Sequence, residues 1–286
     1  MAQEEPQLTD AVLGGTDAQP RPYDAVLGGK IKNMTLVRRI DQAAKEGLGV
    51  LDLSGLGLDE LPPEIGKCTH LRRLDLNHNE ITSIPESLGQ LSHLTWLGLS
   101  HNKITFIPES LGQLSNLIGL YLRNNEITSI PESLGQLSYL RLLDLRNNEI
   151  TSIPESLGQL SNLMTLDLRN NKIIFIPESL GQLYNLGLLI LNDNEITSIP
   201  ESLGQLSNLT GLFLRNNEIT SIPKSLGQLF NLTSLDLNNN KITFVPKTIC
   251  DMKNLEQLDL GKNPLSILGK IWFRPTRRRG YRGIPY

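Results

Sequence analysis

Leucines and isoleucines recur at fixed intervals along most of the chain. A leucine opens a unit at position 48 and again every 23 residues up to position 255. In the unit that spans 94–116, apolar residues fill positions 1, 4, 6, 11, 14, 18 and 21, with asparagine at position 9 and proline at position 15. Nine whole units and a truncated tenth share this spacing. The pattern therefore predicts a solenoid in which each unit packs against its neighbours.

The same unit predicts its own local structure. Positions 3 to 7 alternate between polar and apolar residues, which is typical of a short strand with one buried face. Pro108 and Glu109 suit the first turn of a short helix, and Gly112 limits its length. We expect neighbouring strands to align as a parallel sheet. Asparagine at position 9, as in Asn102, should satisfy turn backbone groups in its own unit and in the next.

The resulting consensus, LxxLxLxxNxIxxIPxxLxxLxx, resembles the leucine-rich repeat family. Its Ile-Pro and LGQL segments are similar to the intracellular, Ras-group type of repeat, and the lead-in at 39–54 is similar to the repeat arm of bacterial Roco-type GTPases. The resemblance implies an α/β leucine-rich repeat solenoid, with a curved parallel sheet on the concave face and short helical or irregular return segments on the convex face. The phosphate-binding GxxxxGK[ST] loop of those GTPases does not occur in this sequence, so their nucleotide chemistry is not implied.

The segments outside the repeats predict the domain organisation. Residues 1–32 show no periodic pattern and carry the sequence DAVLGG twice, so we expect a disordered tail in which DAVLGG is either a docking or processing tag or a duplicated linker. Residues 33–47 predict a capping helix with Thr35 as its N-cap. The repeat domain should span 48–268, and 269–286 should hold the remainder of the C-terminal cap and a basic tail.

The face of the predicted capping helix, and its end, follow from spacing. Leu36, Ile40, Ala43 and Ala44 fall on one side of a helix, and Gly47 stands where a helix would end. We expect this apolar side to cover the open end of the solenoid core.

Composition indicates a single elongated domain that folds in a reducing compartment. The chain is 39% apolar and 20% charged. Its first residues resemble no secretory signal, and no run of 18 apolar residues is present. Cys68 and Cys250 fall in distant repeats and cannot pair. We therefore expect a cytoplasmic protein, and a monomer.

Catalytic or metal chemistry is not indicated. The sequence shows no arrangement of a nucleophile with a base and no cysteines at metal-binding spacing. The four histidines form two pairs on neighbouring repeats, His70 with His93 and His78 with His101, and neither pair has an obvious third ligand. We expect no enzyme activity, no cofactor and no metal site.

Variation among the repeats predicts where a partner binds. The segment EITSIPESLGQLS is identical at 80–92, 126–138, 149–161 and 195–207, whereas positions 3 and 5 of the same units differ. Random drift after duplication would scatter changes over both the strands and the return segments. The contrast therefore favours selection of the concave face for a protein partner. The predicted partner-binding residues are Trp96, Tyr121, Arg123, Leu142, Asp144, Arg146, Asp167, Arg169, Leu188, Ile190, Phe213 and Arg215.

These residues divide into three groups. Two are apolar islands, which contain the aromatic anchors Trp96 and Tyr121 in one case and Phe213 in the other. Between them, aspartates at position 5 flank a row of arginines at position 7. This centre is either a charge ladder that neutralises itself or a polar region that orients the partner.

The predicted function is a non-catalytic protein-interaction scaffold in intracellular signalling or assembly. Two alternatives remain. The arginine cluster at 274–282, interleaved with tyrosine, has the composition of a tail that binds nucleic acid or anionic lipid. In the second alternative, the chain is a repeat arm that acts with a separate GTPase.

Overall fold

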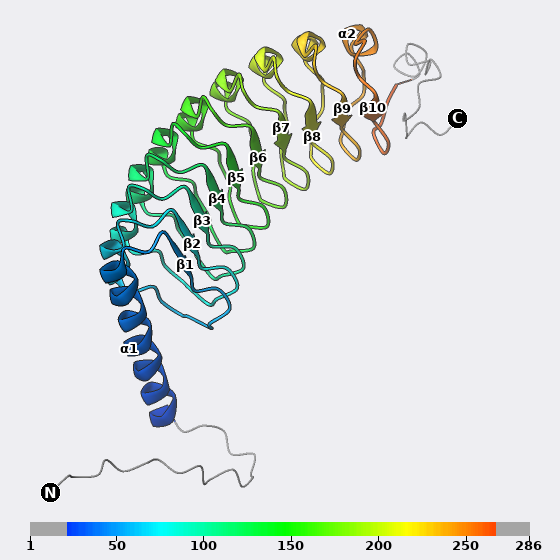
Figure 1. The fold of residues 1–286 in the computed structure, drawn as a ribbon. Helices are drawn as coiled ribbons and strands as arrows, with labels where there is room; N and C mark the ends of the chain where they lie inside the picture. The colour runs from blue at the N-terminus through cyan, green and yellow to red at the C-terminus, as the bar shows by residue number, and fades with distance from the viewer. Residues whose placement is uncertain (1–21, 267–286) are drawn as a thin grey trace, which may run out of the picture.

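The computed structural model describes the backbone of residues 22–266 and the side chains of residues 34–266. Ten parallel strands form one open sheet, in which each strand pairs with the next along the chain from β1 to β10 (Figure 1). The strands are β1 Val50–Asp52, β2 Arg73–Asp75, β3 Trp96–Gly98, β4 Gly119–Tyr121, β5 Leu142–Asp144, β6 Thr165–Asp167, β7 Leu188–Ile190, β8 Gly211–Phe213, β9 Ser234–Asp236 and β10 Gln257–Asp259.

Short 3₁₀ helices run along the outer rim of the arc, and the strands lie inside them (Figure 1). They are η1 Pro63–Lys67, η2 Glu86–Gln90, η3 Glu109–Gln113, η4 Glu132–Gln136, η5 Glu155–Gln159, η6 Glu178–Gln182, η7 Glu201–Gln205 and η8 Lys224–Gln228. A four-residue α-helix, α2 Lys247–Cys250, takes this place in the ninth repeat. The predicted solenoid, with its concave sheet and short convex return segments, is confirmed.

Register between strands repeats the period of the sequence. Each residue of a strand pairs with the residue 23 positions later, as Leu120 does with Leu143. The strands are three residues long, shorter than the five that the alternation predicts. Hydrogen bonds to the next repeat nevertheless continue past the strand, because the Leu122 N–H donates to Asp144 O at 2.8 Å and the Asn124 N–H to Arg146 O at 3.0 Å.

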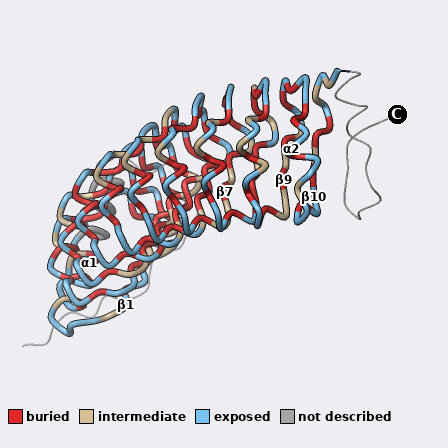
Figure 2. Tube along the Cα trace, turned by 90° about the horizontal axis from the view of Figure 1, so that it is seen from above, coloured by how far each residue is buried: buried red, intermediate tan, exposed pale blue. Residues whose placement is uncertain are grey.

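The periodic apolar residues form one continuous core. Leucines at positions 1, 4, 6, 18 and 21 are almost completely buried in the regular repeats, and together with the isoleucines they make a single cluster along the solenoid (Figure 2). Burial of this kind stabilises each repeat only through its neighbours, since one repeat alone cannot cover its leucines.

Asparagine at position 9 joins each repeat to the one before it. Asn125 is buried, and its Nδ2 donates to Leu122 O in its own repeat and to Leu99 O in the preceding one. Its Oδ1 accepts the Ile104 N–H at 3.0 Å. The structural role is therefore as predicted, but the expected bond to the next repeat is wrong. Each side chain bonds backwards along the chain, because both the Ile104 N–H and Leu99 O lie in the repeat that precedes Asn125.

Helix α1, Pro22–Glu46, covers the first repeat and begins 11 residues before the predicted start at 33. The expectation of disorder is therefore wrong for 22–32, and the second DAVLGG copy lies within the helix. A glycine in a helix costs about 1 kcal/mol, a local penalty that does not by itself end a helix. Thr35 lies inside α1 and is not its N-cap. The first DAVLGG copy falls outside the described residues.

The C-terminal end of α1 agrees with the sequence. Leu36, Ile40 and Ala43 are buried against the first repeat. Gly47 has a φ of 63°, and the Leu48 N–H donates to Ala43 O at 3.0 Å. This is a Schellman end, which glycine favours because it adopts positive φ without a steric penalty.

Candidate binding surface

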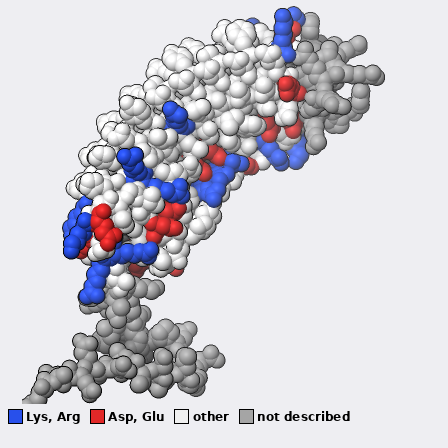
Figure 3. All heavy atoms as spheres, in the orientation of Figure 1, with Lys and Arg blue, Asp and Glu red and all other residues white. Residues whose placement is uncertain are grey.

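Every predicted partner-binding residue lies on or directly beside the concave sheet. The aromatic and aliphatic members are half-buried, as expected for side chains at positions 3 and 5 that lie on the sheet surface without entering the core. The arginines stand two residues beyond the ends of β4, β5, β6 and β8. Figure 3 shows basic and acidic atoms interleaved along the inner side of the arc.

Trp96 and Tyr121 form one aromatic island on neighbouring strands. Their ring centroids lie 5.2 Å apart with 38° between the planes, a tilted arrangement that aromatic pairs favour. The guanidinium of Arg73 lies 3.7 Å from the centre of the Trp96 ring, in cation–π geometry. Arg73 was not predicted as part of this surface, although it pairs with Trp96 in the sheet register.

Each aromatic ring of this surface rests on a glycine of its own strand. A Cβ atom built on Gly98 would lie 2.3 Å from the Trp96 ring, and one on Gly211 would lie 2.6 Å from the Phe213 ring. The corresponding distance from Gly119 to the Tyr121 ring is 3.0 Å. The rings therefore lie across the backbone. The sequences WLG, GLY and GLF contain this signal, which the sequence analysis missed.

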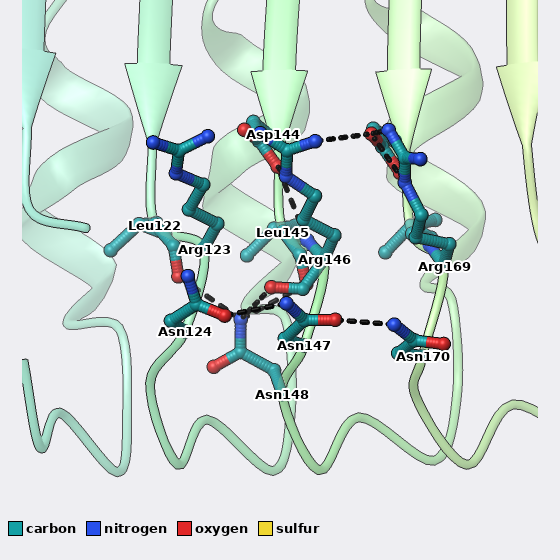
Figure 4. A network of polar contacts seen from close by, with 12 residues as sticks. Leu122, Arg123, Asn124, Asp144, Leu145, Arg146, Asn147, Asn148, Arg169 and Asn170 are labelled. Atoms are coloured by element: carbon teal, nitrogen blue, oxygen red, sulfur yellow. Dashed lines mark hydrogen bonds and ion pairs between the residues drawn. The ribbon is translucent and has the colours of Figure 1, made fainter. Parts of the chain in front are cut away.

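Acidic and basic side chains alternate at the centre of the sheet (Figure 4). Arg146 Nε lies 3.4 Å from Asp144 Oδ1, and its Nη1 lies 3.9 Å from Asp167 Oδ2. Arg169 Nη2 donates to Asp167 Oδ2 at 2.6 Å. Asp144 and Asp167 are buried, with 7% and 6% of their surfaces exposed. Burial raises the pKa of Asp144, and the nearby Arg146 opposes that shift.

Arg123 and Arg215 differ from these paired arginines. Position 5 of their strands is Tyr121 or Phe213 where β5 and β6 have aspartate. As a result, neither guanidinium forms an ion pair with any residue in the described range. The centre of the sheet is thus a neutralised ladder at β5 and β6, flanked by an unpaired arginine on either side.

The second island lies on β7 and β8. Leu188 and Ile190 are half-buried beside Phe213, and Ile190 pairs with Phe213 in the register. Leu188 also closes over Gly211, where an added Cβ would meet it at 2.9 Å. The island is therefore a packed apolar patch and not a set of isolated side chains.

A hollow of about 380 Å³ opens above β3 to β6. Seven predicted residues line it: Trp96, Tyr121, Arg123, Leu142, Asp144, Arg146 and Asp167. Asn77, His78, Ser100 and Thr165 complete the lining and were not predicted. The remaining five predicted residues lie outside it, and among them Phe213 lines a second hollow of similar volume with Asp236 and Asp259.

A row of residues at position 8 forms the rim of the surface. They adopt a left-handed backbone with φ between 54° and 58°, which explains why asparagine is frequent there. Asn147 Nδ2 donates to Asn124 Oδ1, and Asn170 Nδ2 donates to Asn147 Oδ1, so the amides form a ladder from repeat to repeat (Figure 4).

The rim continues as a pair of histidines. The rings of His78 and His101 stack with centroids 4.3 Å apart and 13° between planes, so the two histidines that the sequence pairs are in contact. Burial lowers the pKa of His101, and the neighbouring His78, Arg123 and Arg146 lower it further. Among the described residues, no group of three or more potential ligands is placed to hold a metal ion.

Comparison with known families agrees with this geometry. Models described as leucine rich repeat match residues 46–104 and 98–150, and models described as leucine-rich repeat region match 131–212 and 176–267. The chain belongs to the leucine-rich repeat family. A search of curated proteins finds no match.

Solved leucine-rich repeat structures share the architecture. A leucine-rich repeat protein of Leptospira interrogans is 35% identical, with a TM-score of 0.68 over 79% of this chain and 64% of that one. The ectodomain of the plant receptor kinase GASSHO1/SCHENGEN3 from Arabidopsis thaliana is 38% identical, with a TM-score of 0.70 over 76% of this chain and 27% of that one. InlJ from Listeria monocytogenes is 28% identical, with a TM-score of 0.68 over 79% and 46%.

This leucine-rich repeat chain spans less than two thirds of the length of each of these proteins. Over the part that the structure describes, no helix combines the length and apolar character needed to cross a bilayer. The arginine cluster at 274–282 lies outside that part.

Proposed function

We propose that this chain is a non-catalytic scaffold that binds a protein partner through its concave sheet. We further propose that it works as a monomer in the cytoplasm, in signalling or assembly. The concave sheet offers three half-exposed aromatic rings on a rigid backbone, and such anchors are typical of protein interfaces. A preformed surface also loses little conformational entropy when it binds.

One observation carries the proposal: among four units with an identical return segment, sequence differences are concentrated on the exposed face of the sheet. The return wall repeats a 13-residue segment without change in four units, while positions 3 and 5 of those units hold arginine, glycine, leucine, tyrosine, aspartate and isoleucine. Related structures supply support of a second kind. The GASSHO1/SCHENGEN3 ectodomain was solved in complex with Casparian strip integrity factor 2, and the plant receptor RGFR1 was solved with RGF2.

The test compares two triple variants in affinity capture from the source cells. The first removes the sheet aromatics: Trp96→Ala, Tyr121→Ala and Phe213→Ala. The matched control removes three exposed aromatics at positions 22 and 23, outside the sheet: Tyr139→Ala, Tyr184→Ala and Phe230→Ala. We expect the first variant to lose a partner that the wild type and the control retain, with all three proteins giving the same circular dichroism spectrum.

Two results would contradict the proposal. One is equal capture by both variants. The other is capture that falls steeply with salt and disappears when residues 274–286 are deleted, because this would assign binding to the basic tail.

A further inference from the structure

Two strands of the concave sheet carry the same five-residue sequence pattern. Residues 119–123 read GLYLR, and residues 211–215 read GLFLR. In both, glycine at position 3 lies beneath the aromatic ring at position 5, and arginine follows at position 7. We refer to these two strands, with their following arginine, as the GLYLR and GLFLR modules.

The modules differ from the strands between them in charge. At β5 and β6, the aspartate at position 5 pairs with the arginine at position 7 of the same repeat, as Asp144 does with Arg146. In the modules an aromatic residue replaces the aspartate, so Arg123 and Arg215 form no ion pair with a described residue. Arg123 is half-buried and Arg215 is exposed, and either guanidinium can bind a carboxylate through two parallel hydrogen bonds.

The aromatic ring beside each arginine adds an apolar contact. Because the ring lies over glycine, it rests against the backbone, and it remains half-exposed on the concave side. Each module thus presents a flat apolar surface next to an unpaired positive charge. An acidic residue beside an apolar or aromatic residue is complementary to that combination.

The distance between the modules sets the length of the partner segment. β4 and β8 are separated by four strand spacings, or roughly 19 Å at about 4.8 Å per spacing. An extended peptide rises about 3.3 Å per residue, so roughly six residues bridge the two modules. The apolar side chains of Leu142 and Leu188 lie between them on the same sheet face.

We propose that the concave sheet binds an extended acidic peptide segment, in which two pairs of acidic and apolar residues about six residues apart occupy the GLYLR and GLFLR modules. This inference rests on the proposed function and specifies the chemistry of the partner. The GLYLR module binds more strongly, because Asp144 and Asp167 in its hollow are already paired with Arg146 and Arg169. In the other hollow, Asp236 and Asp259 lie beside Phe213 and form no ion pair with a described residue.

The probe is a display library of random 12-residue peptides, panned on the full-length chain. A Trp272→Phe background leaves Trp96 as the single tryptophan, so its fluorescence reports occupancy beside Tyr121. We expect selected peptides to be enriched in Asp and Glu next to aromatic or apolar residues, with two such pairs about six positions apart.

Charge reversal then tests the two arginines. Arg123→Glu should weaken binding of the selected peptides about tenfold or more, since close charge pairs at interfaces are worth about 1.5 kcal/mol or more. Arg215→Glu should weaken it about threefold or more, a smaller effect because Arg215 is exposed. Peptides with Lys in place of the acidic residues should recover binding to Arg123→Glu. The control is Lys224→Glu, the same kind of charge change at an exposed position of the return wall, where six other repeats already have glutamate. Binding should stay within about twofold.

The outcomes separate this inference from the proposed function. Selected peptides that lose binding in Tyr121→Ala but show no acidic enrichment would overturn the acidic-segment proposal and leave the docking surface in place. If Arg215→Glu leaves the affinity for the acidic peptides unchanged, the two-module arrangement is overturned. If neither Tyr121→Ala nor Phe213→Ala changes the affinity for the selected peptides, the proposal that the concave sheet is the binding surface is contradicted.

Discussion

The sheet wall and the return wall of the same repeats are under opposite constraints. On the return wall, a Cβ added to Gly135 would lie 2.4 Å from the Ser156 carbonyl oxygen, and equivalent glycines of neighbouring repeats show nearly the same distance. On the sheet wall, a Cβ added to Gly119 meets only the Tyr121 ring, at 3.0 Å. Backbone contacts between repeats therefore fix the return wall, while the sheet wall meets side chains that can move. This difference explains why the return wall repeats its sequence while the sheet wall varies.

The largest effect should come from the buried asparagines at position 9, which join each repeat to the one before it. Asn148→Ala leaves the Ile127 N–H and the carbonyls of Leu122 and Leu145 without this partner. Unpaired buried groups cost about 1–3 kcal/mol each, so we expect the free energy of unfolding to fall by about 3 kcal/mol. The shift of the urea midpoint measures it. Asn162→Ala, which removes one exposed bond to Ser138, is the control and should cost about 0.5 kcal/mol or less.

The same substitution on the two walls should give unequal losses. Gly135→Ala forces the backbones of η4 and η5 apart, and we expect a loss of about 2 kcal/mol. Gly119→Ala only displaces the Tyr121 ring and should cost less than about 1 kcal/mol. Urea denaturation of both variants compares them directly. Equal losses would show that the sheet wall is as constrained as the return wall.

A smaller effect concerns the carboxyl groups of the sheet wall. Burial raises the pKa of Asp236 above its ordinary value of 3.8. The folded protein therefore retains this proton to higher pH than the unfolded chain, and the group lowers stability as the pH rises from about 4 through its folded-state pKa. Asp236→Asn keeps an acceptor for the Asn238 N–H and should stabilise the fold by about 0.5 kcal/mol at pH 7.

The pH profile supplies the control for this variant. At pH 3 both the folded and the unfolded wild type hold the proton, so the advantage of Asp236→Asn should disappear. Thermal denaturation at pH 3 and pH 7 tests this. An equal difference at both pH values would contradict the role of burial.

The smallest effect is expected on the return wall. The hydroxyl of Ser133 is buried and has no hydrogen-bond partner within the described part of the chain, and six equivalent serines share this property. Removing an unpaired polar group and leaving the methyl of alanine should be neutral or stabilising by about 0.5 kcal/mol. Urea denaturation of Ser133→Ala measures it. A loss above about 1 kcal/mol would reveal a bond that this geometry does not contain.

Much of the candidate surface could be predicted from the sequence. Alternation within each repeat assigned Trp96, Tyr121 and Phe213 to the exposed sheet face, and the structure places them there. The glycines beneath these rings could also have been found, since each lies two residues away on the same strand. Arg73 was not found, because its contact with Trp96 depends on side-chain directions between strands and not on spacing alone.

The solenoid, its parallel register and its buried leucines could all be predicted from the repeat pattern. A repeat that contacts only its neighbours makes long-range structure follow from a local period. The folded structure was needed to show that α1 begins at Pro22, that position-9 asparagines bond to the preceding repeat, and that Arg146 lies between Asp144 and Asp167. The asparagine bonds and the ion pairs depend on how adjacent repeats pack together, and the order of residues along one strand does not specify that packing.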